Sequence, residues 1–220
     1  STLGEIGVKT VYMMSDGNGI ADRIRHALET PLPSGQTWPR IVFLDMPIED
    51  RAVDTLVAVE KMVEHGVGGI IVLGGDGTHR LVASRAGDVP ITALSTGTNN
   101  VFPAMREATI AGLAAGLVAM GQVPVTAGAI RNKVLRIDVT GIETDLALVD
   151  LCTSTELWVG SRALWRAEGL DQLFLSFAEA DAIGLSSIGG LLRPVARAAE
   201  GGLWLNLADP ATAPTVIAAP

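Results

Sequence analysis

The sequence contains few of the residues on which several classes of protein depend. Only one of its 220 residues is cysteine, three are histidine and 4% are aromatic. The single cysteine, Cys152, excludes an internal disulfide framework and suits a reducing compartment, so we expect a cytoplasmic protein. Its apolar, strand-like surroundings favour a small core residue over a catalytic thiol. The three histidines are too dispersed to indicate a zinc site.

Basic residues are outnumbered: 16 Lys and Arg stand against 24 Asp and Glu, for a net charge of −8 at pH 7. This balance argues against broad, non-specific attraction to nucleic acid, which needs clustered basic side chains. An acidic protein can still bind phosphate locally through backbone N–H groups. The sequence also lacks an apolar run long enough to cross a bilayer, so neither nucleic acid nor a membrane is an expected partner.

Hydrophobic residues make up 48% of the chain, enough for a sizeable core in one large domain or two small ones. Short apolar runs alternate with amphipathic stretches in the first half. The expected strands cover 8–15, 40–47, 66–75 and 89–96, and the expected helices cover 21–29, 49–66, 79–87 and 104–121. Apolar strands separated by helices predict a parallel sheet covered on both faces, and therefore an α/β, Rossmann-like domain.

The pattern changes in the second half, where residues 134–141 alternate cleanly between apolar and polar. Further strands over 143–155 and 201–208, with a helix over 161–180, predict an antiparallel, β-rich domain. We place the boundary within residues 121–130, so that the α/β domain covers 1–122 and the β-rich domain 123–220.

Both ends of the sequence look cut. Residues 1–7 open directly into a helix-like pattern, and residues 214–220 stop where a strand-like pattern begins. We therefore expect part of a longer protein, with the first strand of the α/β domain and the end of the β-rich domain absent.

Glycines surround a lone carboxylate at the end of the apolar run 70–73. The residues that follow this run are Gly74, Gly75, Asp76, Gly77 and Thr78. One interpretation is a hairpin turn, because Asp-Gly suits turns that need positive φ at both central residues. The other is a phosphate cradle at the carboxyl end of a parallel strand, where glycine N–H groups and a helix start bind anions.

In the cradle interpretation, Thr78 supplies a hydroxyl to the phosphate and caps the following helix. Asp76 would repel phosphate in a pure binding site. It makes sense if it holds a cation or takes a proton from an attacking hydroxyl. The helix-like mix of residues after Thr78 favours this interpretation over the hairpin.

A second polar loop follows the next expected strand. It consists of Ser95, Thr96, Gly97, Thr98, Asn99 and Asn100. These hydroxyls and amides can bind ribose, phosphate or a base edge, because they both donate and accept hydrogen bonds. The alternative is an Asn-rich loop that caps a helix at Pro103. Two such loops at neighbouring strand ends converge in space, which favours a shared ligand site.

The segment GGDGT, followed about 20 residues later by STGTNNVFP, resembles the ATP-NAD kinase superfamily, which also contains diacylglycerol and sphingosine kinases. Two later segments, VDLCTSTELWVGSRALW and AIGLSSIGGLLRP, are similar to the acetoin catabolism protein X branch. The resemblance covers most of residues 8–207. It implies an α/β nucleotide-binding domain followed by a β-rich domain, with the active site in the cleft between them.

The resemblance also implies roles for matching residues. The nucleotide phosphates would be lined by Gly74, Gly75, Gly77 and Thr78, while Asp76 would activate the acceptor hydroxyl or arrange its metal. The second nucleotide-contacting loop would comprise Thr96, Gly97, Thr98, Asn99 and Asn100. Small residues that close the site would be Ser186, Ser187 and Gly189. The implied cofactors are ATP or polyphosphate with Mg²⁺, and the implied assembly is a homo-oligomer.

The sequence departs from the family pattern in three places. NAD kinases carry an Asn-Glu pair where this sequence reads Val149-Asp150, so the dinucleotide contact of that Asn is lost. Lipid kinases follow GGDGT with Asn-Glu, and here His79-Arg80 stand there instead. The family's first strand, with its own glycine loop, is not found. These departures weigh against NAD as acceptor, and more strongly against a lipid.

Asp150 has two interpretations, because a carboxylate inside an apolar strand is costly unless it is paired. It is either a buried partner of Arg136 or Arg162, or a ribose or ligand contact that faces the cleft. His79 and the tryptophans are equally open to two interpretations. His79 either contacts phosphate or lies on a helix surface, and Trp158 and Trp165 are expected to pack the domain interface rather than stack on a base.

Three functions follow from these observations. The leading hypothesis is a phosphotransferase that moves phosphoryl from ATP or polyphosphate to a hydroxyl of NAD or another small acceptor. The second is a catalytically inactive nucleotide-binding or regulatory protein linked to acetoin catabolism. The third is a dinucleotide-dependent dehydrogenase, which the absence of a G-x-G-x-x-G motif after the first strand makes the weakest.

Overall fold

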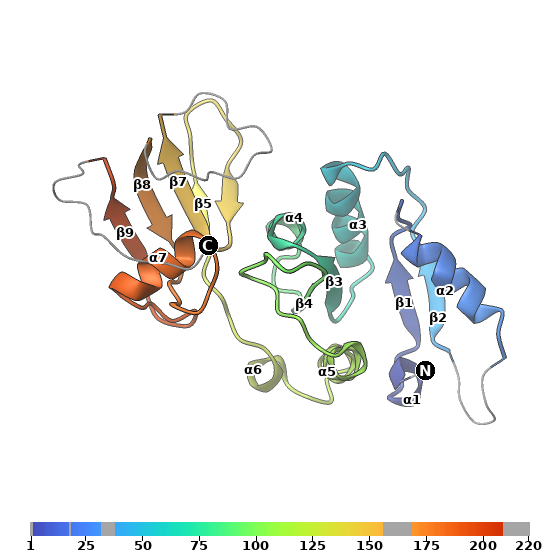
Figure 1. Cartoon of the computed structure of the whole chain (residues 1–220). Helices are drawn as coiled ribbons and strands as arrows, with labels where there is room; N and C mark the ends of the chain where they lie inside the picture. Colours follow the sequence, from blue (N-terminus) through green and yellow to red (C-terminus); the bar gives the residue numbers. More distant parts are fainter. Residues whose placement is uncertain (1, 18, 32–37, 156–168, 209–220) are drawn as a thin grey trace. The chain divides into compact units, whose positions relative to one another are not determined.

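A computed structural model of the chain describes residues 2–17, 19–31, 38–155 and 169–208 (Figure 1). The chain divides into two compact units. The first contains residues 1–98 and 103–130, and the second contains residues 99–102 and 131–220.

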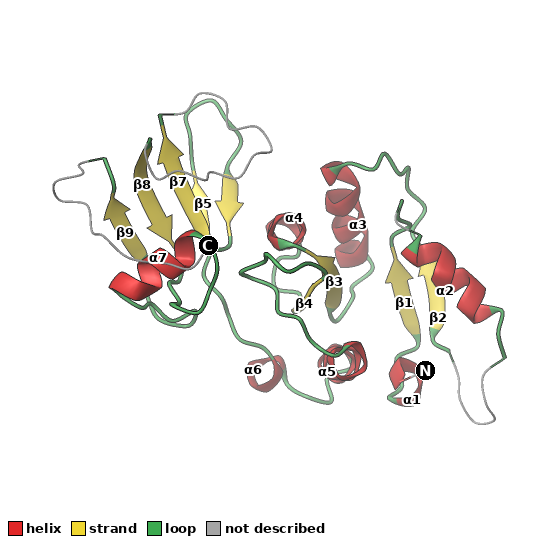
Figure 2. Ribbon diagram, in the orientation of Figure 1, coloured by secondary structure: helices red, strands yellow, loops and turns green. Residues whose placement is uncertain are grey.

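The first unit contains strands and helices in alternation (Figure 2). Its strands are β1 (Thr10–Met13), β2 (Arg40–Phe43), β3 (Ile70–Gly74) and β4 (Ile91–Ser95). Its helices are α1 (Thr2–Glu5), α2 (Ile20–Leu28), α3 (Ala52–Glu64), α4 (Asp76–Arg85), α5 (Ala108–Ala119) and α6 (Val125–Gly128). The predicted order of strands and helices is therefore confirmed for this half of the chain.

The strands of the first unit are parallel, as predicted, but they form two pairs. Strand β1 pairs with β2, and β3 pairs with β4 from Ile70↔Ile91 to Gly74↔Ser95. Among the described residues no ladder joins the two pairs, so the single predicted sheet is only partly present. Apolar strand patterns predict burial, but they do not specify which strands become neighbours.

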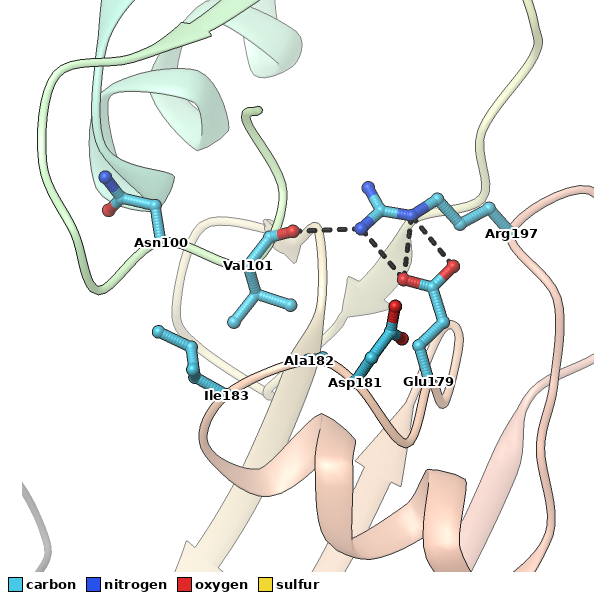
Figure 3. A pocket seen from close by; sticks show the side chains of 7 residues that line it. All are labelled: Asn100, Val101, Glu179, Asp181, Ala182, Ile183 and Arg197. Atoms are coloured by element: carbon cyan, nitrogen blue, oxygen red, sulfur yellow. Dashed lines mark hydrogen bonds and ion pairs between the residues drawn. The ribbon is translucent and has the colours of Figure 1, made fainter. Parts of the chain in front are cut away.

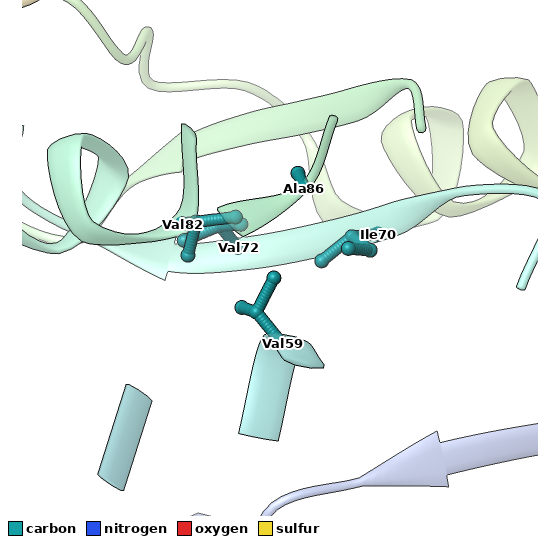
Figure 4. Packing of buried hydrophobic residues seen from close by; sticks show 5 residues of the cluster. All are labelled: Val59, Ile70, Val72, Val82 and Ala86. Atoms are coloured by element: carbon teal, nitrogen blue, oxygen red, sulfur yellow. The ribbon is translucent and has the colours of Figure 1, made fainter. Parts of the chain in front are cut away.

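The core of the first unit lies where α3 and α4 pack against one face of β3 (Figure 4). Its buried members are Val59, Ile70, Val72, Val82 and Ala86. The other face of β3 is exposed, with 41% of Ile71 and 49% of Leu73 accessible to solvent. The prediction that β3 is buried on both faces is therefore wrong.

Helix α5 begins at Ala108, four residues later than predicted. Ala104 forms a parallel bridge with Leu94, so the chain is still extended at this point. The Glu107 carboxylate then accepts hydrogen bonds from the backbone N–H groups of Thr109 at 2.9 Å and Ile110 at 2.7 Å. A side-chain acceptor just before a helix satisfies N–H groups that have no partner within the helix, which fixes its start.

The N-cap makes the stability of this helix depend on pH. The bonds from Thr109 and Ile110 lower the pKa of Glu107 in the folded protein. Its contribution is therefore present above the unfolded-state pKa and is lost as the pH falls through the folded-state pKa. We expect Glu107→Gln to lower the Tm at pH 7 and the difference from wild type to shrink in acid, measured by thermal denaturation. The exposed Glu200→Gln is the control, and a pH-independent difference would contradict the assignment.

The second unit is antiparallel, as predicted. Strand β5 (Leu135–Ile137) pairs with β6 (Asp145–Ala147), and β7 (Asp150–Ser154), β8 (Leu170–Leu175) and β9 (Leu203–Asn206) form a three-stranded sheet in that order. Helix α7 (Leu185–Leu192) packs on this sheet. Its core is built around Leu173, Leu175 and Ala178.

The predicted helix over 161–180 is wrong where the structure describes it, because residues 170–175 form the central strand β8. The spacing of Leu170, Leu173 and Phe174 resembles a helix face. Pairing with β7 on one edge and β9 on the other overrides that local preference. Residues 161–168 lie outside the described part of the chain.

The predicted strand over 143–155 is interrupted between β6 and β7. The carbonyl groups of Leu148 and Val149 both accept a hydrogen bond from the buried Ser176 hydroxyl, at 2.6 and 3.1 Å. The Ser176 N–H also donates to Val149 at 2.8 Å. A buried serine distant in sequence thus satisfies the backbone at the break, which the local sequence of residues 143–155 does not reveal.

Candidate functional site

The segment Gly74–Thr78 forms the corner between β3 and α4. Gly74 is the last residue of β3, Gly75 is the extended N-cap residue, and Asp76 is the first residue of α4. Since β3 and β4 are parallel and α4 connects them, the hairpin interpretation is wrong. The corner has the strand–loop–helix geometry on which the cradle interpretation depends.

Two contacts fix the shape of this corner. A Cβ atom on Gly74 would lie 2.8 Å from both the Cβ and the Oγ1 of Thr78. Only glycine at position 74 therefore allows the Thr78 side chain to pack against the end of β3. The His79 ring is 1% exposed, with Nδ1 2.8 Å from the carbonyl oxygen of Gly75. The surface interpretation of His79 is therefore wrong. Gly77 is exposed, and an added side chain there would meet open space.

A pocket of about 520 Å³ lies in the first unit next to this corner. Its lining comes from residues 14–17 after β1, from Thr78 and Leu81 on α4, and from six residues after β2: Ile48, Asp50, Arg51, Ala52, Asp54 and Thr55. All three groups follow the carboxyl ends of parallel strands, where α/β proteins bind ligands. Thr78 is the one predicted site residue in the described lining; Gly74, Gly75, Asp76 and Gly77 lie on the same corner outside it.

Two carboxylates of the pocket hold its walls in place. Asp16 accepts hydrogen bonds from the N–H groups of Ile20 at 3.1 Å and Ala21 at 2.7 Å, at the start of α2. Asp54, 6% exposed, accepts from the N–H groups of Glu49 at 3.0 Å and Arg51 at 3.2 Å. These bonds give both carboxylates a structural role, because they satisfy backbone donors at helix starts.

The contact between the loops after β1 and β2 was not predicted from the sequence. Asp50 has a left-handed backbone with φ of 54°, and a Cβ atom on Gly17 would overlap its carboxylate. Gly17 belongs to a loop after β1 that also contains Gly19. The signal was available: Asp16-Gly17 follows an apolar run, as Asp76-Gly77 does.

The second predicted loop follows β4. The Ser95 hydroxyl donates to the carbonyl of Gly97 at 2.7 Å, and Thr96, Gly97, Thr98 and Asn99 are exposed. Thr98 belongs to the first unit, whereas residues 99–102 belong to the second. Asn100 lines a separate pocket of about 210 Å³ in the second unit, together with Glu179, Asp181 and Arg197 (Figure 3).

The remaining predicted site residues lie in the second unit. Ser186 is fully buried on α7 and its hydroxyl donates to Phe177 at 3.2 Å, while the Ser187 hydroxyl donates to Gly184 at 2.7 Å. Both hydroxyls therefore serve the packing of α7. Asp150 is half-buried at the start of β7, opposite Leu175. As ligand contacts, these three residues stay predictions.

The expected partners of Asp150 are placed in part. Arg136 donates from Nε to Asp138 at 2.8 Å, an exposed pair that raises the pKa of Arg136 and lowers that of Asp138. Arg162, Trp158 and Trp165 lie outside the described residues, as does any packing by the two tryptophans.

Cys152 behaves as the core residue that the sequence predicts. It lies half-buried on β7 against the Leu173 cluster, and burial raises the pKa of its thiol, with Asp150 and Asp171 raising it further. Because the thiolate is the reactive form, we expect native alkylation by iodoacetamide at pH 8 to be at least about tenfold slower than in denaturant. Mass spectrometry of the Cys152 peptide measures both rates. Equal rates would contradict the burial of the thiol.

Residues 9–123 match the family model of the ATP-NAD kinase N-terminal domain. The chain belongs to the ATP-NAD kinase superfamily. Residues 133–220 match the family model of the acetoin catabolism protein X C-terminal domain. The two matches cover the parallel and the antiparallel strands respectively. The superfamily match begins just before β1 and includes the 520 Å³ pocket and the Gly74–Thr78 corner.

The chain is 47% identical over 214 residues to the acetoin catabolism protein X of Cupriavidus necator. The similarity covers 96% of this chain and 60% of that relative, so this chain spans about three fifths of the relative's length. No solved structure matches the chain. In the part of the chain that the structure describes, no helix has both the length and the apolar character needed to cross a membrane.

Proposed function

We propose that this member of the ATP-NAD kinase superfamily is a phosphotransferase. It moves a phosphoryl group from ATP or polyphosphate to a hydroxyl of NAD or another small acceptor. One observation carries the proposal: the Gly74–Thr78 corner stands at the carboxyl end of a parallel strand and contributes Thr78 to a 520 Å³ pocket. A pocket of that volume is within the range of small-molecule sites.

The chemistry that this corner supports is positioning and charge stabilisation. Backbone N–H groups in the first turn of α4 and the Thr78 hydroxyl bind phosphate oxygens. Asp76 orients the acceptor hydroxyl or takes its proton. Among the described residues no group of three His, Cys, Asp or Glu side chains is arranged to hold a metal. Mg²⁺ is expected to arrive with the nucleotide phosphates, because Mg²⁺ in such sites keeps several waters and is held by substrate phosphates together with one or two carboxylates.

The second candidate is an inactive nucleotide-binding or regulatory protein linked to acetoin catabolism. The observation that favours it is Val149, which stands where the family resemblance implies a dinucleotide-binding Asn and is only 7% exposed. An apolar, buried side chain cannot replace the hydrogen bonds of that amide. This observation bears on NAD as acceptor and leaves phosphoryl transfer to another hydroxyl open.

One experiment separates the two candidates. The full-length protein is incubated with Mg²⁺ and ATP or polyphosphate in the presence of NAD, nucleosides or polyols, and products are read by mass spectrometry. Calorimetry measures nucleotide binding in parallel. A phosphorylated acceptor supports the phosphotransferase, binding with no product over many hours supports the regulatory protein, and the absence of both rejects the site. Light scattering on the same sample tests the proposed homo-oligomer.

A further inference from the structure

Two segments that flank α7 are held side by side in the second unit. The Ala178 N–H donates to the Val195 carbonyl, and the Val195 N–H donates to the Ala178 carbonyl, both at 2.9 Å. This antiparallel bridge brings Glu179 and Arg197 together. Helix α7 packs closely against the segment that contains Glu179, because a Cβ atom on Gly190 would overlap the backbone between Glu179 and Ala180.

Every nitrogen of the Arg197 guanidinium donates at least one hydrogen bond at this point. Its Nε donates to the two Glu179 carboxylate oxygens at 3.1 and 3.2 Å, and Nη2 donates to Oε2 at 3.0 Å. Nη2 also donates to the Val101 carbonyl at 2.9 Å (Figure 3). Nη1 donates to the Phe102 carbonyl at 3.1 Å. The guanidinium carbon lies 4.1 Å from the ring centroid of the buried Phe177.

These contacts form an arginine clamp, defined as Arg197, Glu179 and the carbonyl groups of Val101 and Phe102. The clamp explains why residues 99–102 join the second unit while the chain before and after them belongs to the first. A planar guanidinium can satisfy a carboxylate and two carbonyls at once, which an ammonium cannot do in the same fixed geometry. The backbone immediately after Asn99 and Asn100 is thereby fixed.

We propose that Arg197 is a positioning residue for the second nucleotide-contacting loop. By holding Val101 and Phe102, it sets the backbone from which Asn99 and Asn100 present their amide side chains to a nucleotide. The inference rests on the proposed function for its ligand, a nucleoside triphosphate, and on the described contacts for the clamp. Asn100 lines the same 210 Å³ pocket as Arg197 and Glu179, and its amide group points away from the clamp (Figure 3).

Three variants test the clamp in the full-length protein. Arg197→Gln replaces the five guanidinium donors with a shorter, neutral amide, Arg197→Lys keeps the charge but loses the fork, and Glu179→Gln keeps both donations to the carbonyl groups. The exposed Arg193→Gln, at the end of α7, is the matched control. Hydrogen exchange of the backbone amides of residues 99–102 reports on the loop without requiring activity, and calorimetry with ATP and Mg²⁺ reports on binding.

We expect Arg197→Gln to speed exchange of this loop by about tenfold and to weaken ATP binding by about tenfold, since hydrogen bonds to a charged group are lost. Arg197→Lys and Glu179→Gln should show the same effects more weakly, because each keeps part of the clamp, and Arg193→Gln should show little. If Arg193→Gln loosens the loop as much as Arg197→Gln, the effect belongs to general stability and the inference fails. It also fails if exchange changes and ATP affinity does not.

The proposed function has its own, separate failure. If the wild-type protein binds neither ATP nor polyphosphate, the proposed function and the ligand named here are both rejected. The exchange measurement still decides whether Arg197 holds residues 99–102. Unchanged exchange in Arg197→Gln alongside normal wild-type nucleotide binding would reject the clamp alone.

Discussion

Asp76→Asn abolishes phosphoryl transfer and leaves nucleotide binding nearly intact: this is the result we expect if Asp76 handles the acceptor proton. Asp76 is the first residue of α4, at the corner that follows β3. Asparagine has the same shape and keeps the helix start, but it cannot accept a proton. The loss of a general base costs about 100-fold to 10,000-fold in rate.

The measurement is steady-state turnover with the acceptor found by the product screen, together with ATP affinity by calorimetry and the Tm. Asp45→Asn is the matched control, because Asp45 is exposed in the loop after β2. Turnover of Asp76→Asn within a few-fold of wild type would remove Asp76 from the mechanism. A loss in rate that is accompanied by a lowered Tm would show that the carboxylate stabilises the fold instead.

Gly190→Ala is expected to destabilise the protein, although it adds only one methyl group. Gly190 lies within α7, where alanine is normally the better helix former. Here the added Cβ would overlap the backbone of Glu179 and Ala180, and backbone atoms cannot rotate away as a side chain does. Overpacking of this kind costs about 1–3 kcal/mol, and we expect the upper part of that range.

Gly112→Ala provides the control, because Gly112 lies within α5 and a Cβ atom there would meet open space. Gly112→Ala should raise the free energy of unfolding by up to about 1 kcal/mol, since glycine is the poorer helix former. Urea denaturation of both variants measures the two changes. If both variants are stabilised, α7 does not approach the Glu179–Ala180 backbone as closely as described.

Much of the first unit follows from local sequence. The run Ile70–Leu73 followed by glycines predicted the end of β3, and the helix-like residues after Thr78 predicted α4. Periodicity succeeds here because each element is short, has one apolar pattern and is bounded by glycine or by a capping residue. The burial of Cys152 in the second unit was also predicted from local sequence, because its neighbours are apolar.

The failures came where distant residues decide the local structure. Strand β8 was predicted as a helix because Leu170, Leu173 and Phe174 have helical spacing, and its two partner strands are remote in sequence. His79 was open between ligand contact and surface, and only the packing of α4 on β3 shows that its ring is buried. Local spacing carries no information about which side chains a segment will meet.

The sequence by itself determined that a glycine-rich corner with one carboxylate ends a parallel strand, and which family shares it. The tertiary structure decided that loops after β1 and β2 join Thr78 around one pocket. It also decided that Arg197 holds the carbonyl groups of Val101 and Phe102, nearly a hundred residues earlier. The physical reason is that glycine content and periodicity act within a few residues, whereas a donor and its acceptor meet only after the chain has folded.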